Sequence, residues 1–158
     1  MPKRYLFLSL AVVIILFLVY VFGPSGLPRV YTLDMALKNR DYVSLHGTVY
    51  HADVFDAFFH SVQNGADAGV RIVDFTVEGD PIITSVAYQN GLLTVTRDTT
   101  RDRFGRPSVI RTDYQNLLFY RAADGWEYYI ATDLPEITAE LFQSDNIGDI
   151  LISRNASM

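Results

Sequence analysis

The sequence predicts an α+β domain, in which two helices pack on a largely antiparallel sheet of five or six strands, preceded by one N-terminal transmembrane helix. Two observations predict this fold. Residues 32–63 twice carry apolar side chains at helical spacing, and residues 69–132 alternate apolar and polar side chains around two hairpin turns. A chain of 158 residues has room for one domain and a short extra segment.

The N-terminal region begins with an apolar segment, YLFLSLAVVIILFLVYVF at residues 5–22, which is 18 residues long and carries no charge. As a helix rising ~1.5 Å per residue it nearly spans a hydrocarbon core of ~30 Å. Cleaved signal peptides have shorter apolar segments of ~7–15 residues and a small-residue cleavage site. No such site follows here, so we favour an uncleaved signal anchor.

Lys3 and Arg4 precede the anchor, and basic residues of this kind mark the cytoplasmic side of a membrane. We therefore expect a single-pass protein of the cell membrane whose N-terminus is cytoplasmic. Residues 1–4 form the cytoplasmic tail, 5–22 the anchor, 23–31 a linker rich in Pro and Gly, and 32–158 the extracytoplasmic domain.

The charge balance limits the partners of this domain. The first 31 residues hold three of the 13 basic residues and none of the 18 acidic ones, so the rest has 10 basic and 18 acidic residues, a net charge of −8. Such a domain is repelled by nucleic acid. The chain has no Cys, which excludes disulfides, thiolate metal sites and thiol catalysis. We expect neither a metal ion nor another cofactor.

Two helices are expected in the first part of the domain. Thr32 is a suitable N-cap for a helix over residues 32–40, and Phe55, Phe58 and Val62 share one face of a second helix over residues 53–63. Asn64 and Gly65 end that helix. Between the two helices, residues 42–50 alternate as a strand with a bulge at Gly47.

The remainder predicts strands and one short helix. Asn90-Gly91 is a strong hairpin signal between strands over residues 82–89 and 92–98, which follow a strand over 71–77. Asp124-Gly125 joins a second pair, residues 117–121 and 126–132. A helix over residues 135–142 is expected because Pro135 suits its first turn.

The FTVEGDPII segment at residues 75–83 interrupts an apolar run with two acids, a Gly and a Pro. A two-residue turn at Asn90-Gly91 places Thr84 opposite Arg97, and the same register continued outward places Asp80 opposite Arg101 and Glu78 opposite Arg103. One interpretation is a sharp turn with structural ion pairs. The other is an oxygen-rich cation site or an acid–base pair. The candidate binding residues are Glu78, Asp80, Asp98, Arg101, Asp102 and Arg103.

Four segments carry a family resemblance: VSLHG at residues 43–47, RI at 71–72, FTVEGDPI at 75–82 and DTTRDRFG at 98–105. In combination they resemble the bacterial domain-of-unknown-function family 4362, over residues 32–132. The resemblance implies an exported or membrane-anchored domain of Bacillus-type bacteria, and it implies no catalytic residue. Members often carry a Cys pair in the C-terminal hairpin and a Gly at the position of Arg40, and this chain departs from both.

Two surface features allow more than one interpretation. Aromatic residues at 119–120 and 126–129 form either ordinary cross-strand pairs, which we favour, or a stacking platform for a glycan or peptide. Five arginines between residues 97 and 111 either dock an anionic partner or pair with the interleaved acids, which we favour.

These observations predict a membrane-tethered, non-enzymatic module that binds an envelope component or another protein at the bacterial cell surface. The alternative is a small carboxylate- or cation-dependent hydrolase that uses Glu78, Asp80, Asp98 and Asp102.

Overall fold

The computed structural model describes residues 30–144 and 146–155. The predicted tail, the anchor at residues 5–22 and all but the end of the linker lie outside these residues. Within the described ranges, no helix is long and apolar enough to cross a membrane.

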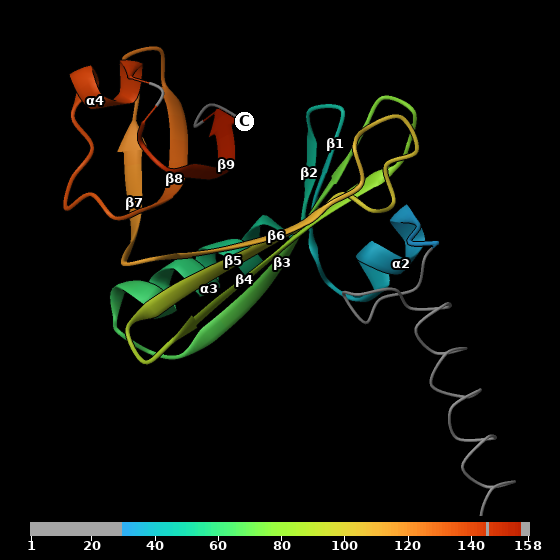
Figure 1. Cartoon of the computed structure of the whole chain (residues 1–158), viewed down its shortest axis with the longest axis horizontal. Helices are drawn as coiled ribbons and strands as arrows, with labels where there is room; N and C mark the ends of the chain where they lie inside the picture. Colours follow the sequence, from blue (N-terminus) through green and yellow to red (C-terminus); the bar gives the residue numbers. More distant parts are fainter. Residues whose placement is uncertain (1–29, 145, 156–158) are drawn as a thin grey trace, which may run out of the picture.

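The larger of the two sheets has six strands in the order β2-β1-β3-β4-β5-β6 (Figure 1). Neighbouring strands in this sheet run antiparallel, except β1 and β3, which run parallel to each other. The strands and the helices interspersed with them are α2 (Leu33–Lys38), β1 (Tyr42–Leu45), β2 (Thr48–Tyr50), α3 (Ala52–Gln63), β3 (Ala68–Phe75), β4 (Pro81–Gln89), β5 (Leu92–Asp98) and β6 (Val109–Tyr114).

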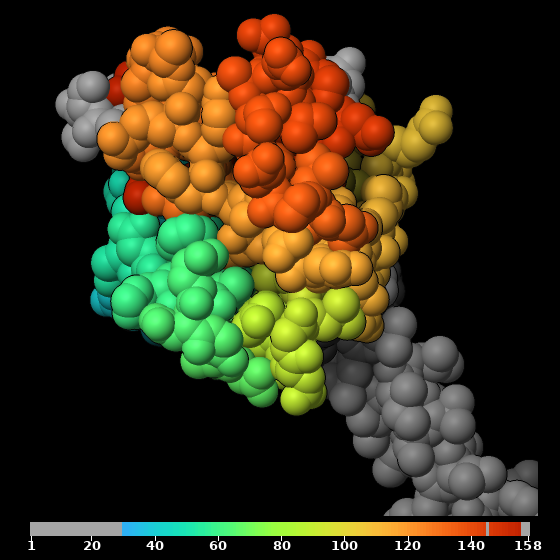
Figure 2. Space-filling view, turned by 90° about the vertical axis from the view of Figure 1, so that its left-hand side faces the viewer, coloured from blue at the N-terminus to red at the C-terminus, as the bar shows by residue number. Residues whose placement is uncertain are grey.

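A second sheet of three antiparallel strands has the order β7-β8-β9. Its elements are β7 (Asn116–Arg121), β8 (Trp126–Thr132), α4 (Ala139–Gln143) and β9 (Asp149–Asn155). Figure 2 shows this sheet and α4, in orange and red, lying above α3 and the turn between β4 and β5.

Several sequence-based predictions are confirmed. The domain is α+β, and the Asn90-Gly91 hairpin pairs Tyr88 with Leu93 and Thr84 with Arg97. The Thr32 hydroxyl caps α2, because its oxygen accepts a hydrogen bond from the Met35 N–H at 3.3 Å.

Four details of the predicted fold are wrong. The hairpin around Asp124-Gly125 does not extend the main sheet but belongs to the second sheet, and strands β6 and β9 were not predicted. Residues 42–50 form a hairpin rather than one strand, since His46 and Gly47 both have positive φ, 48° and 87°, and make a tight two-residue turn. The helix predicted over residues 135–142 begins only at Ala139, where Thr138 caps it.

Each face of the main sheet contributes to a core. On one face, α3 and the second sheet share a core in which Phe55 lies edge-on to Tyr42 and Tyr129, at ring-centroid distances of 5.9 and 5.0 Å. On the opposite face, Ala36 of α2 packs with Val43 and Val73. The second sheet and α3 therefore lie side by side on the same face, and the space between them and the β1–β2 hairpin forms the cleft described below.

Candidate functional site

The predicted site residues lie at one end of the main sheet, in what we call the loop tip: the turn at residues 76–79 and the loop at residues 99–108. In the turn, the Thr76 carbonyl accepts from the Gly79 N–H at 2.9 Å, and the Asp80 carbonyl accepts from the Thr76 N–H at 2.9 Å. Gly79 has φ of 85°, a conformation that other residues rarely adopt. The EGDP segment is therefore a tight connection between β3 and β4.

Asp80 joins the two parts of the loop tip. Its carboxylate accepts from the Arg103 Nε at 2.9 Å and from the Arg103 backbone N–H at 3.0 Å. The hydrogen bond from the Arg103 side chain chiefly, and the one from its backbone as well, lowers the pKa of Asp80. The predicted pairing of Asp80 with Arg101 and of Glu78 with Arg103 is wrong, because the β4–β5 ladder ends at Ile83 and Asp98 and the chain then turns.

Asp98 and Arg101 form the second pair of the loop tip. Both side chains are only 3% exposed, and the Arg101 guanidinium donates to the Asp98 carboxylate at 2.5 Å. The other carboxylate oxygen accepts from the N–H and the hydroxyl of Thr100 at 2.9 and 2.6 Å. Asp98 is thus a buried charge held by a cation and by local hydrogen bonds.

The two remaining candidates are not part of these pairs. Asp102 accepts from the backbone N–H groups of Phe104 and Gly105 at 3.0 and 2.8 Å and so shapes the loop, while Glu78 is exposed. Across residues 30–144 and 146–155, no three His, Asp or Glu side chains are placed to hold a metal ion.

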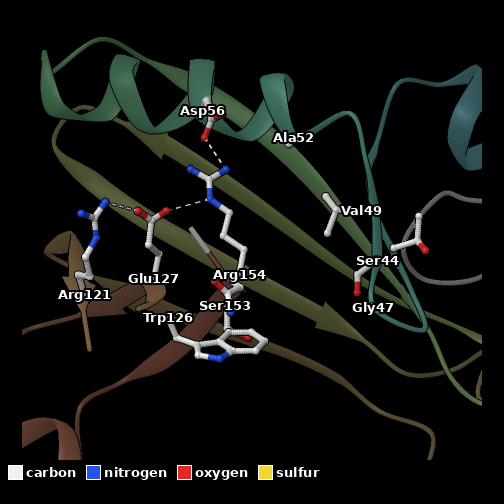
Figure 3. A pocket seen from close by; sticks show the side chains of 12 residues that line it. Ser44, Gly47, Val49, Ala52, Asp56, Arg121, Trp126, Glu127, Ser153 and Arg154 are labelled. Carbon is white, nitrogen blue, oxygen red and sulfur yellow. Dashed lines mark hydrogen bonds and ion pairs between the residues drawn. The ribbon is translucent and has the colours of Figure 1, made fainter. Parts of the chain in front are cut away.

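A second arrangement, which we call the inter-sheet cleft, lies where the two sheets meet α3 (Figure 3). It has a volume of about 810 Å³, within the range of ~300–1,000 Å³ typical of ligand sites. None of the six predicted residues lines it. Its lining comes from the β1–β2 hairpin (Ser44, Gly47, Thr48, Val49), from α3 (Ala52, Asp56) and from the second sheet (Arg121, Trp126, Glu127, Ser153, Arg154, Asn155).

Arg154 of β9 is the central charged group of the cleft. Its guanidinium pairs with Asp56 of α3 at 2.9 Å and with Glu127 of β8 at 3.2 Å. The guanidinium also donates to the Tyr129 hydroxyl at 2.5 Å, and its central carbon, Cζ, lies 5.0 Å from the centroid of the Tyr129 ring. Arg154 therefore fixes the second sheet against α3.

Glu127 is shared by two arginines, because Arg121 of β7 pairs with its other carboxylate oxygen. The Arg121 hydrogen bond chiefly, and that from Arg154 as well, lowers the pKa of Glu127 despite burial. Two arginines and two carboxylates thus neutralise one another in the cleft wall, as Figure 3 shows.

Trp126 is the only tryptophan of the chain and lines the cleft. The residue is 38% exposed, and Figure 3 shows its indole beside Ser153 and across the cleft from Val49. Two other aromatic residues of this hairpin form ordinary contacts. Tyr120 and Tyr128 pair across strands, and the ring of Phe142 of α4 packs on both, at ring-centroid distances of 4.5 and 4.6 Å. The cross-strand interpretation is confirmed for these two tyrosines.

A smaller cleft of about 250 Å³ lies between β9 and the main sheet, lined in part by Asp74, Arg97 and Asp149. Burial raises the pKa of Asp74, although the charge of Arg97 and a hydrogen bond from Ser44 oppose the shift.

Sequence analysis singled out Trp126 only within its aromatic segment and missed Asp56, Arg121 and Arg154. One signal was present. Glu127 falls in phase with Tyr129 and Ala131 on β8, so an acid occupies a position on the buried face of a strand and needs a cationic partner. The sequence does not indicate which arginine supplies it.

Comparison with known proteins identifies one family. The model described as "Domain of unknown function (DUF4362)" matches residues 39–121, more than half of the chain. The match includes the loop tip and ends at Arg121, before β8 and β9 contribute Trp126, Glu127 and Arg154 to the cleft. No curated protein and no solved structure matches the chain.

Proposed function

The chain belongs to the DUF4362 family of domains of unknown function, and we propose that it is a membrane-anchored, non-enzymatic module that binds a cell-envelope component or another protein in the inter-sheet cleft. The observation that carries the proposal is the cleft itself. Its walls come from three separate parts of the chain, its charges are fixed by mutual ion pairs, and Trp126 offers a broad apolar contact surface beside them.

The arrangement of the loop tip favours a binding module over the hydrolase alternative. A general acid or base must have a carboxylate available to the substrate, and a cation site needs several oxygen ligands that converge. Asp80 and Asp98 instead bond to arginines, and Asp102 bonds to backbone N–H groups. Both features suit a structural role for these carboxylates.

Membrane anchoring rests on residues 5–22, whose length and lack of charge suit a membrane span, and on Lys3 and Arg4 before them. The test is protease accessibility. In intact cells that produce the full-length chain with a C-terminal epitope tag, added protease removes the tag and the protein stays with the membrane fraction. A tag that is protected until the cells are lysed contradicts the proposed orientation.

The single tryptophan provides the test of cleft binding. We expect soluble glycan fragments of the cell wall, or short synthetic peptides, to change the emission of Trp126 in a saturable manner when they are titrated into the full-length chain in detergent. The Trp126→Phe variant should keep the fold but lose the emission signal. The affinity of this variant for the ligand is then measured by competition against a labelled ligand. If ligands from neither class change the emission or compete, the cleft is not the binding site.

A further inference from the structure

The inter-sheet cleft is bordered by two open strand edges. In the described part of the chain, β2 is the outer strand of the main sheet and pairs only with β1, while β9 is an outer strand of the second sheet and pairs only with β8. Residues of both strands line the cleft, Thr48 and Val49 on one side and Ser153 and Arg154 on the other. An open edge offers unpaired backbone groups to an added strand.

The register identifies which groups of β2 face outward. The turn at His46-Gly47 has two residues, so Leu45 and Thr48, which close it, exchange backbone hydrogen bonds. The next pair, Ser44 and Val49, is then a pair that exchanges no backbone hydrogen bonds. The N–H and C=O of Val49 therefore point away from β1.

The same reasoning applies to β9. The Ala122 N–H donates to the Trp126 carbonyl at 2.8 Å, which marks the closing position of the β7–β8 hairpin. Counting from there, the backbone groups of Glu127 point toward β9 and bond to Arg154, and Tyr128 opposite Ser153 is a pair without hydrogen bonds. The N–H and C=O of Ser153 therefore point away from β8.

The walls of the cleft limit the chemistry of its occupant. Arg121 and Arg154 already pair with Glu127 and Asp56, so the cleft offers no excess charge to an anionic or cationic ligand. Val49, which is 38% exposed, and Trp126 provide apolar contact instead. Backbone donors and acceptors on two edges, together with apolar contacts and a neutral wall, suit an extended peptide without charged side chains.

We propose that the inter-sheet cleft captures an extended, uncharged peptide segment of a partner protein, whose main chain pairs with β2 at Val49 and with β9 at Ser153. This inference rests on the proposed function and specifies its ligand. The bound segment becomes a strand between the two sheets. Its main chain provides affinity, and the side chains that contact Trp126 and Val49 provide selectivity.

The probe is a random heptapeptide library displayed on phage and selected on the immobilised full-length chain. Enriched peptides are then synthesised, and their affinities are measured through Trp126 emission. We expect the enriched peptides to be rich in β-branched and aromatic residues and poor in charge.

Matched variants separate the backbone from the side chains. Val49→Pro removes the outward N–H, whereas Val49→Ala keeps it, and Ser153→Pro and Ser153→Ala form the same comparison on β9. Proline is tolerated where a strand's N–H faces outward, so each proline variant should fold, which circular dichroism verifies. We expect each proline variant to bind about tenfold more weakly, or worse, than the alanine variant at the same position, because only the proline lacks the outward N–H.

The peptide provides an independent test that leaves the protein unchanged. N-methylation of the main-chain nitrogens on one edge of the peptide removes donors without altering a side chain, and it should abolish binding. Equal affinity for methylated and unmethylated peptides, together with unaltered binding by both proline variants, overturns strand pairing.

Two further results separate this inference from the proposed function. If no peptide is enriched but a soluble glycan changes Trp126 emission, the cleft is a binding site and the peptide inference fails. If neither ligand class changes it, both proposals fail.

Discussion

The loop tip and the inter-sheet cleft are both built from arginine–carboxylate pairs, and they differ in how far apart the partners lie in the sequence. At the tip, Asp98 pairs with Arg101 three residues later, and Asp80 pairs with Arg103 of a neighbouring loop. In the cleft, Asp56 of α3 pairs with Arg154 near the end of β9. The tip pairs hold loops in shape, whereas the cleft pairs hold two layers of the domain together.

The most buried of these pairs lies at the tip. Asp98 and Arg101 are almost fully buried, whereas the Arg154 and Arg121 side chains are 25% and 60% exposed. Because a buried charge without a partner costs more than an exposed one, the tip contains the energetically most critical pair. A binding site, in contrast, has to remain accessible.

The largest effect is expected from Asp98→Asn. Asparagine keeps the shape and the bonds to Thr100 but leaves the Arg101 charge buried without its carboxylate, so we expect a loss of about 3–5 kcal/mol in the free energy of unfolding, the typical cost of breaking a buried ion pair. Urea denaturation followed by circular dichroism measures it. The double variant Asp98→Asn with Arg101→Met should regain much of the loss. If Asp98→Asn alone costs less than Arg154→Ala, the pair most critical for stability lies in the cleft and not at the tip.

Arg154→Ala tests how strongly the cleft pairs connect the layers. The substitution removes the bonds to Asp56, Glu127 and the Tyr129 hydroxyl, and we expect a loss of about 1.5–3 kcal/mol, as for hydrogen bonds to charged groups. Arg121→Ala is the matched control. Its side chain is mostly exposed, so the loss should stay at about 0–1 kcal/mol. Equal losses for the two arginines would mean that Arg154 does not fix the second sheet against α3.

The tip was more accessible to sequence-based reasoning than the cleft because its partners are local. The Asn90-Gly91 turn fixes the register of β4 and β5, and from it the proximity of Asp80 to the arginines of the following loop can be predicted. That Asp80 pairs with Arg103 and not with Arg101 cannot be predicted in this way, because counting along the register assumes that the ladder continues past Ile83. The ladder ends at Ile83 and Asp98, and Arg101 pairs with Asp98.

The cleft depends on long-range packing that no local pattern encodes. Leu117 to Thr132 reads as a hairpin whether it extends the main sheet or forms a sheet of its own. In the structure the hairpin pairs with β9, a strand of mixed composition in which a bulge at Ile150 and Leu151 disturbs the alternation of apolar and polar residues. Without β9, Arg154 and therefore the ion pairs of the cleft could not be predicted.

Acid titration distinguishes the shared carboxylate of the cleft from a neutral replacement. The pKa of Glu127 is lowered in the folded state, so its stabilisation is complete above the unperturbed pKa of ~4.3 and is lost as pH falls through the lowered value. Glu127→Gln should therefore be less stable than the unaltered chain at pH 7, and the difference should vanish in acid. Melting temperatures between pH 7 and pH 3 measure it.

Asp80→Asn provides the corresponding experiment at the loop tip. The pKa of Asp80 is lowered for the same reason, so the sign is the same, but its partner Arg103 is 71% exposed and the effect should be smaller than that of Glu127→Gln. A pH-independent difference at either position would show that the carboxylate acts through its shape and not through its charge.

The smallest effect has the opposite sign and concerns Asp74, which lies in the smaller cleft. Burial raises its pKa in the folded state, so the folded chain binds a proton more readily than the unfolded one, and stability falls as pH rises from the unfolded pKa through the raised value. Asp74→Asn removes this penalty and should raise the melting temperature slightly at pH 7, with the gain fading in acid. Asp113→Asn, at an exposed carboxylate 3.7 Å from Arg111, is the control and should change little. A loss of stability for Asp74→Asn at pH 7 would mean that attraction to Arg97 outweighs burial, and the smaller cleft would then resemble the ion-paired cleft beside it.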